Sequence, residues 1–300
     1  MTEQQKKPSI FEESTQYQHW RFSPEKIWDI RNKSTEAAIS RVRRNLQEEI
    51  NEHTNTTEHI ERDYLSAKEE HALCSFYEIQ LQAMSKHCHF SNLVMATAVI
   101  YMKRFYLHNT VMDYHPKDVF LTCLFLATKS ESERISIDDF GKTLRLPNTA
   151  NVLKLEFTLS QGLKFQYYVH HPYRPAYGFF LDMQTAPAMD MKALKETYKR
   201  VDKAIADILL TDLPLIYQPS QLALAAFMIA GKDNQFDQQI KQYIQHRFSE
   251  QEATTLLDVL EGILAYYRAV PAKVTQEEAR KIDYKLKLCM NPAMNPDSAM

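Results

Sequence analysis

The sequence contains little glycine and has long stretches without proline. It has 5 glycines in 300 residues, whereas average usage would give about 21. Neither glycine nor proline occurs between Glu25 and His115. Tight turns and β-hairpins depend on these residues, so their scarcity argues against a sheet protein. Leu, Ala, Lys, Glu and Gln, which favour helices, are abundant. We therefore predict an all-α fold with long helices.

Other absences narrow the class of protein. The formal net charge is only -2, so no global attraction to nucleic acid or an anionic membrane is expected. The four cysteines show no paired spacing, and with no visible signal peptide they indicate reduced thiols in an intracellular protein. The longest apolar runs are about half the length of a membrane span. The length and the hydrophobic content of 44% suit two domains, each with its own core.

The chain contains an internal repeat. The stretch "YHPKDVFLTCLFLATK" at 114–129 returns as "YQPSQLALAAFMIAGK" at 217–232, with five of sixteen positions identical. Each stretch has a proline suited to the first turn of a helix, Pro116 or Pro219. The residues that follow are apolar on all sides, which is typical of a helix in the middle of a bundle. We therefore predict two five-helix domains, each built around one copy.

Local signals place the other helices and the boundaries. The polar N-terminus is expected to be poorly ordered to about Gln18, and "FSPEK" offers Ser23 as the N-cap of a helix to about Ile50. Ser66 and Glu69 fit a capping box at the start of the next helix. The tail from Asn291 is predicted to be loose. Further N-caps are predicted at Ser91, Ser136 and Asn148. Helices of the second half are predicted over 173–183, 191–210, 219–230, 235–247 and 249–268, and a last helix in "VTQEEARKIDYKLKL".

These signals divide the chain into four parts. The polar stretch "NEHTNTTEH" is the first boundary, and "QYYVHHPYRPAYG", with two prolines that restrict the preceding residues, is predicted as an extended linker. The predicted parts are an N-terminal tail and helix (1–60), a first domain (61–166), a second domain (167–272), and a C-terminal helix and tail (273–300).

Several longer motifs resemble those of the cyclin family. "YMKRFYLHNTVMDYHPKDVFLTCLFLATK" resembles the second and third helices of a cyclin box in its transcriptional form, and "VHHPYRP" resembles the linker of the cyclin H and cyclin C types. "TDLPLIYQPSQLALAA" and "QHWRFSPE" are most similar to the cyclin H type. The resemblance covers roughly residues 20–288. It implies two tandem five-helix cyclin-fold domains with extra N- and C-terminal helices.

The resemblance also implies a function and partners. It predicts a regulatory subunit that binds and activates a cyclin-dependent kinase in the kinase module of transcription factor IIH (TFIIH). The substrates would be the C-terminal tail of RNA polymerase II and the activation loops of other such kinases. A third subunit acting as assembly factor and a nuclear location are implied as well. No cofactor, no metal, and no direct contact with nucleic acid or membrane are expected.

By the same resemblance, three residues are expected to contact the kinase: Lys129, Glu156 and Phe165. In cyclins, a lysine that closes the third helix and a glutamate early in the fifth helix meet backbone groups beside the kinase's mobile regulatory helix. Lysine offers three donors and glutamate accepts, so the two can satisfy partner groups that would otherwise lose their hydrogen bonds. Two departures from the family pattern occur: Ser130 follows the lysine, and "EEHALCSFYEIQL" lacks the "MRAIL"-like substrate-docking motif.

Simpler interpretations stand beside these. Lys129 is also explained as a cation that interacts favourably with the dipole at a helix C-terminus. The same holds for Lys232, the equivalent residue of the second copy of the repeat. "KHCH" at 86–89 has metal-binding residue types but no second ligand pair at a zinc-like spacing. His170 and His171 fit packing in the linker better than a catalytic pair. "RVRR" at 41–44 fits a solvated helix face, a phosphate contact or a position beside the kinase.

Other functions find less support. The chain lacks a phosphate-binding glycine loop, a G-x-S-x-G motif, a His-Glu-x-x-His motif and kinase signature loops, so no catalysis is expected. The nearest alternative is a cyclin C-like subunit of the Mediator kinase module. A further alternative is a TFIIB-like promoter-binding factor, which would need a basic face and usually an N-terminal zinc ribbon.

Overall fold

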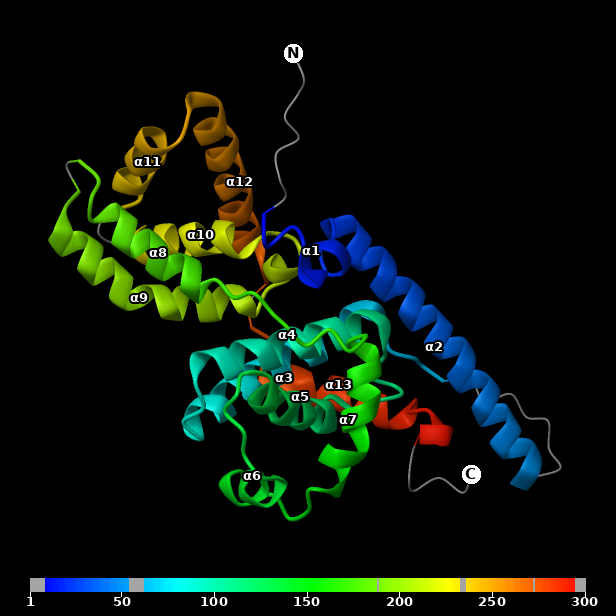
Figure 1. Ribbon diagram of the computed structural model, residues 1–300. Helices are drawn as coiled ribbons and strands as arrows, with labels where there is room; N and C mark the ends of the chain where they lie inside the picture. The colour runs from blue at the N-terminus through cyan, green and yellow to red at the C-terminus, as the bar shows by residue number, and fades with distance from the viewer. Residues whose placement is uncertain (1–8, 54–61, 188, 233–235, 272, 295–300) are drawn as a thin grey trace. The chain divides into compact units, whose positions relative to one another are not determined.

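The computed structural model describes residues 9–53, 62–187, 189–232, 236–271 and 273–294. Every regular element in these ranges is a helix, and the chain divides into two compact units (Figure 1). The predicted all-α class is therefore confirmed. None of the helices in these ranges combines the length and the hydropathy needed to span a membrane.

The first-repeat unit comprises Ser23–Tyr167 and Ala272–Met300. Its central helix is α5, which packs against α3, α4 and α7 and buries almost every side chain from Val119 to Thr128. This confirms that the first copy of the repeat is a core helix. The predicted boundary near residue 60 lies outside the described residues. The helices of this unit are α2 (Pro24–His53), α3 (Ala67–His87), α4 (Asn92–His108), α5 (Pro116–Ser130), α6 (Ile137–Thr143), α7 (Ala150–Gly162), α13 (Gln276–Leu288) and the short η3 (Pro292–Met294).

The second-repeat unit comprises Met1–Phe22 and Tyr168–Pro271. Its central helix is α10, which contacts α8, α9, α11 and α12 and buries all side chains from Leu222 to Met228. The second copy of the repeat therefore has the same place in its own bundle as the first. The helices are α1 (Thr15–His19), α8 (Tyr173–Met183), α9 (Met191–Leu209), η1 (Leu213–Leu215), α10 (Pro219–Gly231), α11 (Phe236–Arg247) and α12 (Glu250–Ala269).

Local capping signals explain where several helices begin. At α3, Ser66 Oγ accepts the Glu69 N–H at 3.3 Å, and the Glu69 carboxylate accepts the Ser66 N–H at 2.8 Å. The predicted N-caps Ser91 and Ser136 are also confirmed. The N-cap of α7 is Thr149, one residue after the predicted Asn148. Asn148 Oδ1 nevertheless accepts the first backbone N–H of α7, that of Ala150, at 2.8 Å. Such bonds satisfy N–H groups that a helix leaves without partners at its start.

The N-terminal segment is more ordered than the sequence predicts. Disorder to about Gln18 is wrong for the described part of this segment, which includes α1. Gln16 is 5% exposed; its Nε2 donates to the His170 carbonyl at 3.3 Å, and its Oε1 accepts the His170 N–H at 2.7 Å. The Trp20 side chain is fully buried. The segment is thus part of the second-repeat unit, through contacts with residues far away in the sequence.

The predicted loose tail from Asn291 is also wrong for residues 291–294. Asn291 is 3% exposed, and its N–H donates to the Met112 carbonyl at 2.9 Å. Its side chain accepts from Asn45 Nδ2 at 2.9 Å and donates to Asp113 Oδ1 at 2.7 Å. One buried amide therefore connects the C-terminal segment to α2 and to the turn between α4 and α5. The short helix η3 follows directly.

Candidate functional site

Two of the three predicted site residues meet at the surface of the first-repeat unit. Lys129, in the last turn of α5, places its Nζ 2.5 Å from Oε1 of Glu156 on α7. The two side chains are 40% and 25% exposed. The Lys129 ammonium also lies 4.3 Å from the centre of the buried Phe125 ring, which favours this position of the cation.

This ion pair contributes little to folding. Exposed pairs of this kind stabilise a protein by about 0.2–1 kcal/mol. The ammonium keeps donors, and the carboxylate keeps acceptor positions, beyond those used in the pair. Lys129 and Glu156 can therefore bind donor and acceptor groups of another molecule without leaving their helices.

The third predicted residue, Phe165, lies beyond the end of α7. Lys164 and Phe165 both have left-handed backbone angles, with φ of 54° and 57°. This conformation is uncommon for residues other than glycine. The Phe165 N–H donates to the Ser160 carbonyl at 2.9 Å, which closes the turn. The turn leaves the Phe165 side chain 55% exposed.

Two further residues belong to this surface and were missed by the sequence interpretation. Leu153 and Phe157 are 47% and 64% exposed, and their spacing of four residues puts them on one face of α7. The Phe157 ring meets the Phe165 ring edge to face, with centroids 6.2 Å apart. Exposed apolar side chains that cluster in this way mark interaction sites. The missed signal is that Leu153 and Phe157 fall off the core-facing stripe of Val152 and Leu159.

We call the set formed by Lys129, Leu153, Glu156, Phe157 and Phe165 the α7 surface. It combines an accessible ion pair with three exposed apolar side chains, all within one unit. Large apolar groups next to a few hydrogen-bonding groups are the usual composition of a protein–protein interface. The arrangement is suited to binding a protein partner.

Ser130, the departure from the family pattern, has a structural role. Its Oγ donates to the Leu126 carbonyl at 3.1 Å and lies 2.8 Å from the Tyr101 hydroxyl. The same hydroxyl donates to the Tyr167 carbonyl at 2.6 Å. Burial raises the pKa of Tyr101, which keeps this donor protonated. Ser130 thus helps to fix the end of α5 beside Lys129.

The remaining candidate residues take other places. Arg41 pairs with Asp113, so it is not part of a freely solvated face. The His170 ring packs edge to face against Phe11 and Tyr168, at 5.5 and 4.8 Å. Among the described residues, no group of three or more His, Cys, Asp or Glu side chains is arranged to hold a metal ion.

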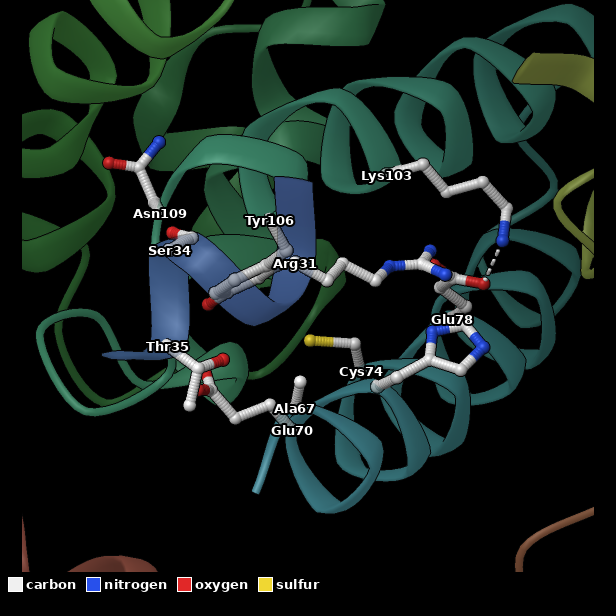
Figure 2. Close-up of a pocket in the computed structure, with 11 residues that line it drawn as sticks. Arg31, Ser34, Thr35, Ala67, Glu70, Cys74, Glu78, Lys103, Tyr106 and Asn109 are labelled. Carbon is white, nitrogen blue, oxygen red and sulfur yellow. Dashed lines mark hydrogen bonds and ion pairs between the residues drawn. The ribbon is translucent and has the colours of Figure 1, made fainter. Parts of the chain in front are cut away.

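A polar cavity lies between α2, α3 and α4 (Figure 2). Its wall includes the buried ion pair of Lys103 and Glu78, with Nζ and Oε2 2.6 Å apart. Glu70 accepts the Thr110 hydroxyl and the Val111 N–H through Oε2, at 2.7 and 2.9 Å, and burial raises its pKa. The space open to the centre of a water molecule is about 20 Å³, which suits one or two waters. This cavity belongs to the core and is too small for a cofactor.

Two protein-family models match this chain, one in each repeat. The model of the cyclin N-terminal domain matches residues 42–168. The model of the cyclin C-terminal domain matches residues 171–272. Cyclin mcs2 of Schizosaccharomyces pombe is 31% identical over 97% of this chain and 88% of its own length. The chain belongs to the cyclin family.

The likeness to the cyclin H type is confirmed as well. Cyclin-H1-1 of Arabidopsis thaliana is 29% identical over 96% of this chain and 91% of its own length. Cyclin CCL1 of Saccharomyces cerevisiae is 32% identical over 82% of this chain; the match spans 63% of the yeast protein.

Solved structures show the same relation. A chain of the CAK complex from Chaetomium thermophilum bound to ATP-γ-S superposes with a TM-score of 0.82 at 29% identity, covering 94% of this chain and 89% of that one. A chain of the yeast TFIIK (Kin28/Ccl1/Tfb3) complex gives 0.69 at 30% identity, covering 85% and 99%. The two predicted tandem cyclin-fold domains are thereby confirmed.

Proposed function

We propose that this cyclin is the regulatory subunit of a cyclin-dependent kinase in a kinase module of the TFIIH type. The chain itself is not catalytic; it binds the kinase and activates it. The substrates are the C-terminal tail of RNA polymerase II and the activation loops of other cyclin-dependent kinases. A third subunit stabilises the assembly, and the complex works in the nucleus. The similarity to cyclins in CAK and TFIIK complexes supports this assignment.

The observation that carries the proposal is the contact of Lys129 with Glu156 next to exposed apolar side chains. The pair binds backbone groups beside the kinase's mobile regulatory helix. Phe157 and Phe165 pack against apolar side chains of that helix. Helices α5 and α7 hold Lys129, Glu156 and Phe157, and the turn after α7 holds Phe165, so these side chains lose little conformational entropy on binding.

Activation follows from where the partner helix is held. An active protein kinase needs a lysine–glutamate pair that is completed when its regulatory helix points inward. A cyclin that binds only this inward position shifts the population of the kinase towards the active state. The α7 surface would therefore raise kinase activity without touching the substrate.

The test is binding of the purified chain to a purified kinase subunit of this type. Removing one member of a buried charged contact costs about 2–5 kcal/mol, so Lys129→Ala and Glu156→Ala should each weaken binding at least about tenfold. Phe157→Ser should weaken it similarly by removing a central apolar contact. Lys232→Ala is the matched control, because Lys232 ends the equivalent helix of the second repeat. If all four variants bound the kinase as tightly as the wild-type chain, the assigned interface would be wrong.

The choice of partner distinguishes the alternatives. Binding to a Mediator-type kinase in preference to a TFIIH-type kinase would transfer the chain to the cyclin C type. Binding to promoter DNA without a kinase would instead support a TFIIB-like function, and that binding would fall steeply with salt.

A further inference from the structure

Helix α9 of the second-repeat unit carries four lysines on one face, which we call the lysine stripe. Its members are Lys192, Lys195, Lys199 and Lys203, and all four are exposed. Their spacings of three and four residues place them on the same side of the helix. At 1.5 Å per residue the stripe is about 16 Å long. The buried side chains Leu194, Val201 and Ile208 lie on the opposite side, so the stripe points away from the core of its unit.

The positive charge of this face is only partly compensated. Lys199 pairs with Glu196 at 2.8 Å, and both side chains are more than half exposed. Within the described part of the chain, the ammonium groups of Lys192, Lys195 and Lys203 form no ion pair. Like charges one helical turn apart repel each other. An anionic ligand along the stripe would relieve this repulsion in a chain whose overall charge is slightly negative.

Helix α8 adds apolar side chains beside α9. The two helices lie side by side (Figure 1) and are joined by the stacked rings of Phe180 and Tyr198, with centroids 4.1 Å apart. On α8, Tyr177 and Leu181 are 54% and 47% exposed and lie one turn apart. Gly178 lies between them in the sequence, and no atom beyond its chain neighbours and the nearby backbone of its own helix comes within 4 Å of the position its Cβ would take. The surface there is open.

We propose that α8 and α9 form a docking face for an acidic segment of another protein, with apolar side chains interspersed among its carboxylates. The carboxylates meet the lysine stripe, and the apolar side chains cover Tyr177 and Leu181. In such recognition the apolar anchors give affinity and the charges give register. A duplex nucleic acid fits less well, because its phosphate backbone would leave the exposed side chains of Tyr177 and Leu181 uncovered.

The docking face and the proposed kinase contact use residues of different units. The lysine stripe lies in the second-repeat unit, whereas Lys129 and Glu156 lie in the first-repeat unit. Variants of the stripe should therefore leave kinase binding unchanged, and the two proposals can fail independently.

The experiment is a titration of the full chain against a fluorescein-labelled peptide, followed by fluorescence anisotropy. The peptide carries glutamate at most positions and leucine or phenylalanine at every third or fourth position. The test variant combines Lys192→Glu, Lys195→Glu and Lys203→Glu. Each exposed charge contact changes affinity a few-fold, so the combination should weaken binding at least about tenfold. Rising salt should weaken binding of the wild-type chain.

The matched control changes charge elsewhere by the same amount. It combines Lys68→Glu, Lys86→Glu and Lys117→Glu, three exposed lysines of the first-repeat unit, and should keep affinity within about twofold. The pair Tyr177→Ser and Leu181→Ser should also weaken binding, because it removes the two exposed apolar side chains that the peptide would cover.

Three results would overturn the proposal. One is the absence of binding to the labelled peptide. Another is an equal loss in the control variant, which would mean that only net charge matters. The third is equally tight binding of a glutamate peptide without apolar residues, of a phosphopeptide or of duplex DNA, which would show a general polyanion surface. Far-ultraviolet circular dichroism of each variant ensures that a lost affinity is not a lost fold.

Discussion

Replacing Glu78 with methionine tests the interior of the first-repeat unit. Lys103 Nζ donates to Glu78 Oε2 at 2.6 Å, and the side chains are 1% and 3% exposed. Removing one partner of a buried ion pair costs about 3–5 kcal/mol, because the other charge stays buried without compensation. In a domain of this size each kcal/mol lowers the melting temperature by about 2–4 °C. The melting temperature of this unit should therefore fall by about 6–20 °C.

The assay is thermal unfolding followed by circular dichroism, with hydrogen exchange to identify the unit that unfolds first. Glu78→Met combined with Lys103→Met should recover most of the loss, since replacing both charges by apolar groups is often neutral or stabilising. Glu196→Met is the control; its exposed pair with Lys199 should change stability by less than about 1 kcal/mol. A loss in Glu78→Met no larger than in this control would refute the reasoning.

Other predictions concern packing and pH. Gly162→Ala would put a Cβ 2.6 Å from Cδ2 of the buried Phe105 ring, so thermal unfolding should show a loss of about 1–3 kcal/mol. Gly178→Ala, in open space on a helix, should instead gain up to about 1 kcal/mol; a loss there would contradict the description. The Tyr243 hydroxyl helps to hold the pKa of Asp182 below its ordinary value of 3.8. Because this folded-state pKa is lowered, the carboxylate stabilises the fold above pH 4, and that stability is lost as the pH falls through the folded value. Asp182→Asn should make the melting temperature depend less on pH in this acid range. An unchanged pH dependence of the melting temperature would contradict the assignment.

Features that depend on neighbouring residues could be predicted from the sequence. The capping box of Ser66 and Glu69 is local, since its two bonds join residues three positions apart. The same holds for the two central helices, each of which begins with a proline and is apolar on all sides. The internal repeat and the family motifs then identified two copies of one domain. Lys129 and Glu156 were brought forward by the resemblance, and their contact is visible only in the structure.

Features that depend on distant residues could not be predicted in this way. Gln16 is polar and lies in a polar segment, yet its amide matches the backbone of His170, 154 positions away. Asn291 lies in a polar tail, and its partners come from two distant segments, Asn45 on α2 and Met112 with Asp113 in the turn between α4 and α5. Phe157 falls off the apolar stripe of Val152 and Leu159, and its contact with the Phe165 ring is visible only in the structure. In each case the pattern gives the chemistry of the side chain and not the location of its partner.

The most direct test of the central claim is kinase activity reconstituted from purified parts. A TFIIH-type cyclin-dependent kinase is assayed on a peptide from the RNA polymerase II tail, alone and with this chain. We expect activity to rise on addition of the wild-type chain and of Lys232→Ala, and to stay near the level of the kinase alone with Lys129→Ala or Glu156→Ala. Unchanged activity with the wild-type chain, or full activation by both interface variants, would contradict the assignment.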